Sequence, residues 1–489
     1  MYQINKQFNL KTIFKNYKLE SILFGLWSLK EKLQPIQVAC TTTIAIEFCS
    51  PGSYDDSISH IAEEKLLKLV RKATQFCLED NTICKDSSVN KIFYTLFSLM
   101  ANQFNLISNY NYDFARALLL YKIIPEEIGT KKNKLDLPSL FEKDKGYSIE
   151  DYLRVCFIAS AAINGSGRFN DNYFIGVESI TDSIKFDTMN KILSELSVSA
   201  IHYRRERRRI NLTNSFKYHP LFMYPIIRPW SKIPIHSKQK RYLSPLPNLI
   251  GHKAHFGLYH HFLTKYHTKF TSFFGKEIFE CYVEKTLNSC RFDENLFDED
   301  DIKEKYKIPE GVKIPDFLFI NGNNGIIVEC KAAVLPLGIY TSGNVKDFKS
   351  TVEKIYIGVN QTANFETYAL EKSLFHVTKW MRLVITYEML WGMSSDILSD
   401  ILITDFKKEN EAKKFKEEYK GVLILSISQL DDIQQFVTKN CSLLSILNEV
   451  SNKNNFLDVI RKLSAETGRT FADSHLFKYT EEITDNLLH

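Results

Sequence analysis

Two carboxylates and a lysine interrupt an otherwise apolar stretch between residues 314 and 332. Asp316 opens a run of β-branched and aromatic residues, and a second apolar run contains Glu329 and Lys331. The two runs are separated by Asn-Gly-Asn-Asn-Gly, whose residues favour turns and tolerate positive φ. This pattern predicts a two-stranded hairpin that folds Asp316 back beside Glu329.

The alternation of side chains along the second strand determines what shares a face with Glu329. Lys331 is two residues away and lies on the same face, whereas Val328 and Cys330 point to the other. Burying such carboxylates is costly unless a cation compensates their charge. Two oxygen ligands with open positions suit Mg²⁺, which keeps bound waters and accepts phosphate oxygens. With a lysine to orient water or stabilise phosphate charge, the chemistry indicated is metal-assisted phosphodiester hydrolysis.

At these residues the chain resembles the PD-(D/E)xK nuclease superfamily, which has the restriction-endonuclease-like fold. Pro315 and Asp316 match the first half of the motif, and Glu329, Cys330 and Lys331 match the second half. The resemblance implies that Asp316, Glu329 and Lys331 are catalytic. It also implies a Mg²⁺ ion, replaceable by Mn²⁺, on the two carboxylates and the main-chain carbonyl of Cys330. The alternative is a surface hairpin that carries a Glu–Lys pair.

The helix expected between residues 262 and 288 carries a carboxylate within its apolar face. Glu280 lies among positions whose spacing predicts burial. The resemblance implies that a helical glutamate here joins the metal site, so Glu280 is predicted as a third metal ligand and a further catalytic residue. Glu277 and Glu284 are the fallback residues for this role. The alternative is a glutamate that pairs with a lysine and has no part in chemistry.

The elements expected after the hairpin continue the same architecture. They are a helix at 344–372, a strand at 381–386, a charged helix at 405–419, a buried strand at 421–426 and a helix capped by Ser428. This order predicts an α/β fold with a mixed sheet flanked by helices. The resemblance extends over residues 273–427, and it suggests Gln361 on the first of these helices as an accessory site residue.

The remaining chain divides into three further regions. Residues 1–203 carry no recognised catalytic motif and are predicted to form a mainly helical domain of unknown role. A junction is expected at 204–269, before the nuclease-like domain at 270–440. Two short helices are expected within 441–489. Expected helices in the first region lie near 17–33, 56–78, 90–104, 111–122, 149–163 and 186–211. The Thr- and Ile-rich segment 39–48 is expected to be a strand, as is 173–180.

Positive charge is concentrated in the junction. The chain has a net charge of +5, yet residues 204–269 contain fourteen Lys and Arg against one acidic residue, Glu206. A basic stretch in a nearly neutral chain is the footprint expected of polyanion binding. The alternative is a solvated helix end, favoured by the helix dipole, followed by a basic linker. The predicted nucleic-acid-binding residues are Arg204, Arg205, Arg207, Arg208, Arg209, Lys238, Lys240 and Arg241.

Composition sets wider limits. A chain of 489 residues with 44% hydrophobic and 25% charged residues is expected to form two or three globular domains. The nine cysteines form no CxxC pair, and neither a signal core nor a membrane-length apolar run is evident, so a cytoplasmic protein is expected. Five histidines lie between His252 and His267 without cysteines or carboxylates nearby in sequence, which argues against zinc there.

Together these features favour a metal-dependent nuclease, endo- or exonucleolytic, that acts on DNA in preference to RNA. A nuclease without an ATPase motif suits a bacterial restriction or phage-defence effector, by analogy with the fold's common employment. A homo-oligomer or a partner protein is compatible with the sequence. Two alternatives stay open: a nucleic-acid-binding protein that kept the scaffold without cutting, and a protein-interaction module.

Overall fold

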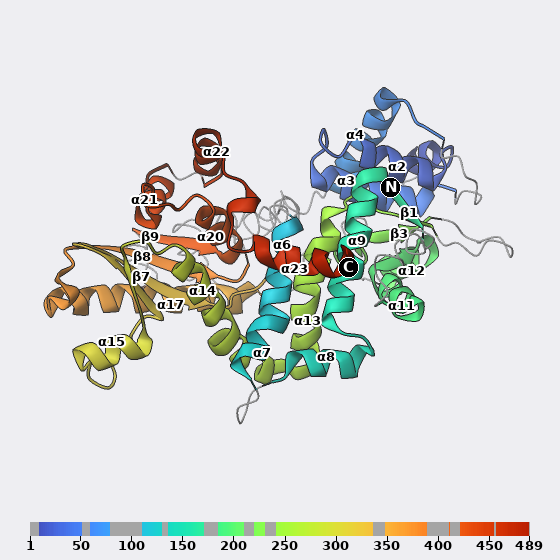
Figure 1. Ribbon diagram of the computed structural model, residues 1–489. Helices are drawn as coiled ribbons and strands as arrows, with labels where there is room; N and C mark the ends of the chain where they lie inside the picture. The colour runs from blue at the N-terminus through green and yellow to red at the C-terminus, as the bar shows by residue number, and fades with distance from the viewer. Residues whose placement is uncertain are drawn as a thin grey trace.

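The chain forms an α/β structure that is mostly helical and contains two mixed sheets within its described residues. Figure 1 shows a five-stranded sheet on the left, the N-terminal helices on the right, and long helices between them. The computed structural model describes residues 9–50, 59–78, 110–129, 135–170, 184–209, 220–229, 241–335, 348–388, 410, 421–453 and 456–488. The expected elements at 90–104, 173–180 and 405–419 lie outside these described residues, apart from residue 410.

The five-stranded sheet contains the predicted hairpin. Its strands in spatial order are β5 (Asn295–Asp298), β6 (Phe317–Asn321), β7 (Asn324–Lys331), β8 (Lys379–Thr386) and β9 (Val422–Ser426). The first three are antiparallel to one another, whereas β7, β8 and β9 are parallel. The hairpin and the strands expected at 381–386 and 421–426 are confirmed. The short edge strand β5 was not predicted, because its half-exposed residues show no alternation.

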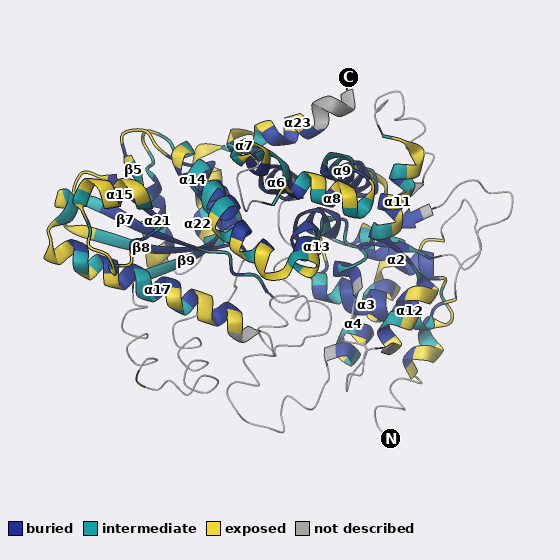
Figure 2. Ribbon diagram, turned by 90° about the horizontal axis from the view of Figure 1, so that it is seen from below, coloured by how far each residue is buried: buried dark blue, intermediate teal, exposed yellow. Residues whose placement is uncertain are grey.

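Helices cover both faces of this sheet. One face packs against α17 (Phe348–Glu371), as Figure 2 shows, with the exposed residues of α17 on its outer side. The other face packs against the π-helix η4 (Phe274–Phe279), α14 (Glu280–Ser289) and α20 (Ile427–Gln434). The expected helix at 344–372 is thus confirmed within its described part. Ser426, not Ser428, caps α20, since its Oγ accepts the Gln429 N–H at 3.2 Å.

The N-terminal helices include one that the sequence pattern predicted wrongly. α2 (Leu19–Ser28), α3 (Pro35–Phe48) and α4 (Glu63–Leu78) pack together, and α3 occupies the segment expected to be a strand. This helix starts at Pro35, which suits the first helical turn. Thr41 and Thr43 donate their hydroxyls to main-chain carbonyls four residues earlier, at 2.7 and 2.9 Å. Burial on nearly every side therefore outweighs the β propensity of the threonines.

A group of helices links the N-terminal helices to the sheet. They are α6 (Tyr110–Leu118), η1 (Leu119–Ile123), α7 (Ile124–Ile128), α8 (Leu137–Lys145), α9 (Ile149–Ser166) and α13 (Asn248–Phe273). The helices expected at 111–122 and 149–163 are confirmed. The C-terminal region contains α21 (Leu443–Lys453), α22 (Phe456–Thr467) and α23 (Phe477–Leu488), so it has one helix more than expected. α23 returns to pack against α6 and α9.

A smaller sheet spans the boundary expected at residue 203. Its order is β1 (Arg168–Asn170), β4 (Arg241–Leu243), β3 (Ile226–Arg228) and β2 (Ser197–Ser199). β2 divides the helix expected at 186–211 into α11 (Phe186–Leu196) and α12 (Ala200–Arg209). The junction thus contributes two strands to a sheet shared with the preceding region. The remaining short elements are η3 (Pro220–Phe222), α15 (Glu299–Tyr306), η5 (Leu374–His376) and η6 (Phe471–Asp473).

A buried ion cluster ties the helices to the sheet. We define the Arg116 cluster as Arg116, Asp113, Asp431 and Tyr282. Arg116 donates to Asp431 Oδ2 through Nε at 2.9 Å and Nη2 at 2.7 Å, and through Nη1 to Asp113 Oδ1 at 3.1 Å. Tyr282 donates its hydroxyl to Asp431 Oδ1 at 2.9 Å. The cluster therefore connects α6, α14 and α20 with charged hydrogen bonds.

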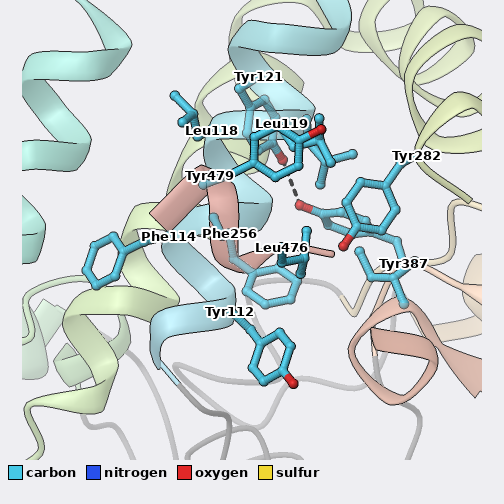
Figure 3. Packing of buried hydrophobic residues seen from close by; sticks show 14 of the residues in the cluster. Tyr112, Phe114, Leu118, Leu119, Tyr121, Phe256, Tyr282, Tyr387, Leu476 and Tyr479 are labelled. Atoms are coloured by element: carbon cyan, nitrogen blue, oxygen red, sulfur yellow. Dashed lines mark hydrogen bonds between the residues drawn. The ribbon is translucent and has the colours of Figure 1, made fainter. Parts of the chain in front are cut away.

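The core beside this cluster is aromatic. The hydroxyl oxygens of Tyr121 and Tyr387 lie 2.7 Å apart, and Figure 3 shows this pair among buried side chains that include Phe114 of α6, Phe256 of α13 and Tyr282 of α14. His255 Nε2 lies 2.8 Å from the same Tyr387 hydroxyl. One apolar core therefore continues from the linking helices to the five-stranded sheet. None of the described helices is long and apolar enough to cross a membrane.

Candidate active site

The hairpin brings Asp316 and Glu329 together as predicted. Phe317 pairs with Val328 in the antiparallel register, so the next position places Asp316 opposite Glu329. Asp316 Oδ2 accepts the main-chain N–H of Cys330 at 2.7 Å, which fixes its carboxylate against β7. The turn between the strands uses Gly322 at positive φ, a conformation that suits glycine.

Of Asp316 and Glu329, Glu329 is the more deeply buried. The residue is 2% exposed, and its Oε1 accepts a hydrogen bond from Lys331 Nζ at 2.5 Å. Its Oε2 is also buried and has no hydrogen-bond partner among the residues that the structure describes. Burial, and then the negative charge of Asp316, raise the pKa of Glu329 to about 8. An acceptor in this position is costly to leave unpaired, so it favours a cation.

Glu280 shares the electrostatic environment of Asp316 but is held by a lysine. Burial, and then the charge of Asp316, raise the pKa of Glu280 to about 7. Burial also raises the pKa of Asp316 itself, against the opposing effect of the Cys330 N–H. Lys276, one helical turn before Glu280, forms an ion pair with it at 2.9 Å and a second with Glu299 at 3.1 Å. Glu280 thus lies near Asp316 and is paired with a lysine, and both hypotheses for its role stay open.

The fallback residues Glu284 and Glu277 interact with other ionisable side chains. Burial is the largest effect on the pKa of Glu284 and raises it. The charged neighbours that also act on this pKa are Asp298, Lys285 and Asp301. The charge of Glu277 helps to raise the pKa of Cys281. The charge of Asp316 acts on Glu280, and Glu280 remains the helical glutamate predicted to act with it.

α17 covers the face of the sheet on which the Lys331 side chain lies. A side chain at Gly358 would place its Cβ 3.1 Å from Lys331 Cγ and 3.2 Å from Val384 Cγ1. The missing side chain thus lets the stem of Lys331 lie directly beneath the helix. Gln361 follows one turn later, and its Oε1 is buried without a hydrogen-bond partner in the described part of the chain. Its approach to the reacting groups stays a prediction.

The donor set fits a hard divalent cation with few protein ligands. Two adjacent carboxylates, one with an unpartnered buried oxygen, suit Mg²⁺, which often uses one or two carboxylates and retains waters. Within the described residues, no group of three or more His, Cys, Asp or Glu side chains is assembled to hold a metal ion. The predicted set of Asp316, Glu329 and Glu280 as three metal ligands stays a prediction, and in this structure Glu280 is paired with Lys276. The role of the Cys330 carbonyl stays a prediction.

The basic residues of α12 divide into anchored and exposed groups. Arg204 donates to two main-chain carbonyls at the end of α3, at 2.5 and 3.1 Å, and buried Arg207 pairs with Glu47 at 2.6 Å. Arg208 also pairs with Glu47, at 3.1 Å, but its side chain is 67% exposed. Arg205 is exposed as well. The side chains of Arg209 and Arg241, and the whole of Lys238 and Lys240, lie outside the described residues.

The histidines of α13, apart from the exposed His267, pack into the helical core. Burial lowers the pKa of His252 to about 3 and that of His260 to about 4. The rings of His252 and Phe256 stack at 4.5 Å, and His261 lies 3.2 Å from Asp144. Contacts with aromatic rings and with the carboxylates of Asp144 and Asp113 account for the positions of these side chains.

Two lysines near the site were not predicted. Lys276 stands four residues before Glu280, a spacing that signals an ion pair on a helix. Lys354 lies on α17, and its Nζ donates to the main-chain carbonyl of Ala332, the residue after Lys331, at 3.2 Å. No local pattern marks Lys354, because its approach depends on how α17 crosses the sheet.

Comparison with known proteins supplies no family for this chain: no family model, no curated protein and no solved structure matches it. Any function must therefore be argued from the chemistry of the site itself.

Proposed function

We propose that the protein is a metal-dependent nuclease of the PD-(D/E)xK type that hydrolyses phosphodiester bonds, with DNA as its preferred substrate. The observation that carries this proposal is the buried carboxylate of Glu329, which has one oxygen on Lys331 and the other unpartnered, beside Asp316. A structural ion pair would satisfy both oxygens, whereas a site prepared for a cation leaves one open.

The surrounding architecture supports the proposal. Asp316, Glu329 and Lys331 meet at the end of a hairpin in a mixed sheet with helices on both faces, which is the arrangement that the sequence resemblance implies. Rigid strands fix the carboxylates, and α17 covers the stem of Lys331. We therefore extend the proposal to a restriction-endonuclease-like fold for residues 270–440.

Each side chain then has a defined task. Asp316 and Glu329 would hold Mg²⁺ or Mn²⁺, which supplies Lewis-acid stabilisation of phosphate charge and an activated water when bound. Lys331 orients the attacking water and stabilises negative charge that develops on the phosphate. Glu280 adds negative charge at the edge of the site while Lys276 holds its carboxylate. Gln361 is an accessory group whose free oxygen can accept a hydrogen bond.

The setting of this activity is argued by analogy. A nuclease domain combined with a large helical region suits a bacterial restriction or phage-defence effector. All eight described cysteines are free thiols, which is compatible with a reducing compartment such as the cytoplasm. Exposed Arg205 and Arg208 remain the described residues of α12 that are available to contact phosphates.

A direct assay tests the proposal. Purified protein is incubated with duplex DNA, single-stranded DNA and RNA, in separate reactions with Mg²⁺, Mn²⁺ or EDTA. We expect cleavage of DNA with either metal, none with EDTA, and recovery when excess Mg²⁺ is restored. Cleavage that persists in EDTA, or intact substrates under every condition, would overturn the proposal. Binding of DNA without cleavage would instead indicate a scaffold that no longer cuts.

A further inference from the structure

One edge of α17 lies beside the site and carries a lysine, Lys354, that the hydrolytic roles leave unused. Lys354, Gly358 and Gln361 are four and three residues apart, so they lie on one side of the helix. Gly358 is buried against Lys331, whereas Lys354 remains exposed. Lys354 therefore stands at the border between the sheet-facing side of α17 and solvent, one turn from the point of contact with Lys331.

The position of the Lys354 ammonium group is fixed by the end of β7. Its Nζ donates to the carbonyl of Ala332 at 3.2 Å, immediately after the strand that ends at Lys331. Among the described residues, the partner of this group is that neutral carbonyl. Desolvation, and then the positive charge of Lys331, lower the pKa of Lys354, so the two ammonium groups influence each other. A second anion would relieve this repulsion.

The two lysines differ in what neutralises them. Lys331 is paired with Glu329 at 2.5 Å and its side chain is 19% exposed, whereas Lys354 has a neutral carbonyl as its described partner. Ile357, an apolar side chain that is 49% exposed, lies on the same border of α17. A cation beside an exposed apolar group suits a sugar-phosphate backbone, which presents both a charge and an apolar sugar face.

We propose that Lys354 binds a phosphate of the substrate strand next to the one that is cut, so that the strand runs along the exposed border of α17. This inference rests on the proposed nuclease function and defines how the substrate lies in that site. Lys354 is here a binding residue: its task is to set the register of the strand, while Lys331 acts at the scissile phosphate.

The test uses the full-length protein with Glu329→Gln as a background that does not cut. Binding of a short DNA duplex is measured across a range of salt concentrations, with and without Lys354→Ala. We expect the Lys354 variant to bind more weakly and to lose about one unit of salt slope, as expected for one phosphate contact. Lys354→Arg should restore most of the slope, because it retains the charge.

A matched control removes an exposed lysine elsewhere on the same sheet. Lys379 begins β8 beside Asn324, at the opposite end of β7 from Lys331. Lys379→Ala should leave both affinity and salt slope unchanged. A loss of slope equal to that of the Lys354 variant would show a non-specific effect of net charge and would overturn the assignment.

Chemical substitution of the DNA identifies the phosphate. Each duplex of a series carries one uncharged methylphosphonate, placed at successive positions beside the cut. For one of these duplexes, the parent protein and the Lys354 variant should have equal affinity. If the difference persists at every position, Lys354 contacts no phosphate there and only supports the Ala332 carbonyl. Such a result, with cleavage by the wild type intact, refutes this inference and leaves the nuclease function standing. Absence of both binding and cleavage in the wild type would refute the two together.

Discussion

Two groups of buried charged side chains differ in how the oxygens of their carboxylates are hydrogen-bonded. In the Arg116 cluster, both oxygens of Asp431 accept hydrogen bonds, and Arg116 donates to two carboxylates. In the site at the end of β7, Glu329 has one buried oxygen without a partner among the described residues, and the pKa values of three neighbouring carboxyl groups are raised. Burial alone therefore does not distinguish the two groups. They differ in the unpartnered buried oxygen of Glu329, whose other oxygen is paired with Lys331.

The two groups are also mechanically connected. α14 carries Glu280 toward the hairpin carboxylates and, two residues later, Tyr282 toward Asp431. Because successive residues of a helix point in different directions, one helix can serve both groups. The Arg116 cluster, whose hydrogen bonds are satisfied, thus holds α14 rigid beside the hairpin carboxylates. Rigid support of this kind suits an active site.

The largest expected effect comes from Asp316→Asn. Asparagine retains an oxygen that can accept the Cys330 N–H, so the fold should survive. The loss of one metal-binding carboxylate should abolish cleavage, and removing a like charge should relieve repulsion with Glu329. Cleavage assays and thermal unfolding, run on the same preparation, check both parts. A variant that cuts at the parental rate, or that is unfolded, contradicts the assignment.

The corresponding change in the Arg116 cluster should lower the stability of the fold. Asp431→Ala leaves Arg116 buried with Asp113 as its remaining cluster partner, and removes the acceptor of the Tyr282 hydroxyl. Breaking a buried ion pair in this way should lower the free energy of unfolding by roughly 3–5 kcal/mol. Urea unfolding measures the loss. A destabilisation no larger than that of Asp316→Asn would remove the distinction between the two groups.

Lys331→Ala should have a smaller effect, confined to turnover. Loss of one preorganised electrostatic donor typically lowers a catalytic rate by about 10²-fold, while affinities for Mg²⁺ and DNA change much less. Single-turnover cleavage and calorimetric Mg²⁺ titration separate these quantities. If Lys331 merely neutralises Glu329, its removal should tighten metal binding with nearly normal cutting, and that outcome would end its catalytic role.

The smallest effect is expected from the arginines at the end of α12, of which Arg205 and Arg208 are exposed. Replacing Arg205, Arg208 and Arg209 should weaken binding to all DNA sequences alike and flatten the salt slope by about one unit per lost phosphate contact. Arg207→Ala is the matched control, since this residue is buried on Glu47. It should lower stability without the same change of slope. An unchanged slope in the triple variant would assign these arginines to a solvated helix end.

The hairpin could be predicted from sequence because three local signals agree there. Alternation, turn residues and β-branched composition all point to two strands, and the register follows from the turn. α3 was predicted wrongly, because a helix buried on nearly all sides shows no amphipathic period and its threonines favour a strand. Thr41 and Thr43 satisfy their hydroxyls within the helix, which composition does not reveal.

The side chains that complete the site depend on contacts distant in sequence. The pairing of Lys276 with Glu280 was accessible from their spacing of four residues, but its link to Glu299 required the position of α15. Lys354 reaches β7 because α17 crosses the sheet at Gly358. Long-range packing of this kind leaves no local pattern, so only the structure shows these residues beside the site.

The most direct test of the central claim is Glu329→Gln, assayed for cleavage and for stability of the metal-free protein across pH. A raised carboxyl pKa means that the folded state holds the proton more tightly than the unfolded state. The stability that this proton provides is fully present below the ordinary value of 4.5 and is lost as pH rises through about 8. The amide that replaces the carboxyl group in this variant cannot ionise, although Asp316, Glu280 and Lys331 still surround it.

We therefore predict that the melting temperature of Glu329→Gln exceeds that of the wild type by a margin that grows as the pH rises toward 8, without Mg²⁺. The same variant should show no cleavage at any Mg²⁺ concentration. A variant that cuts normally, or one whose stability falls below that of the wild type at every pH, would contradict the account of Glu329 as a carboxylate held ready for a metal ion.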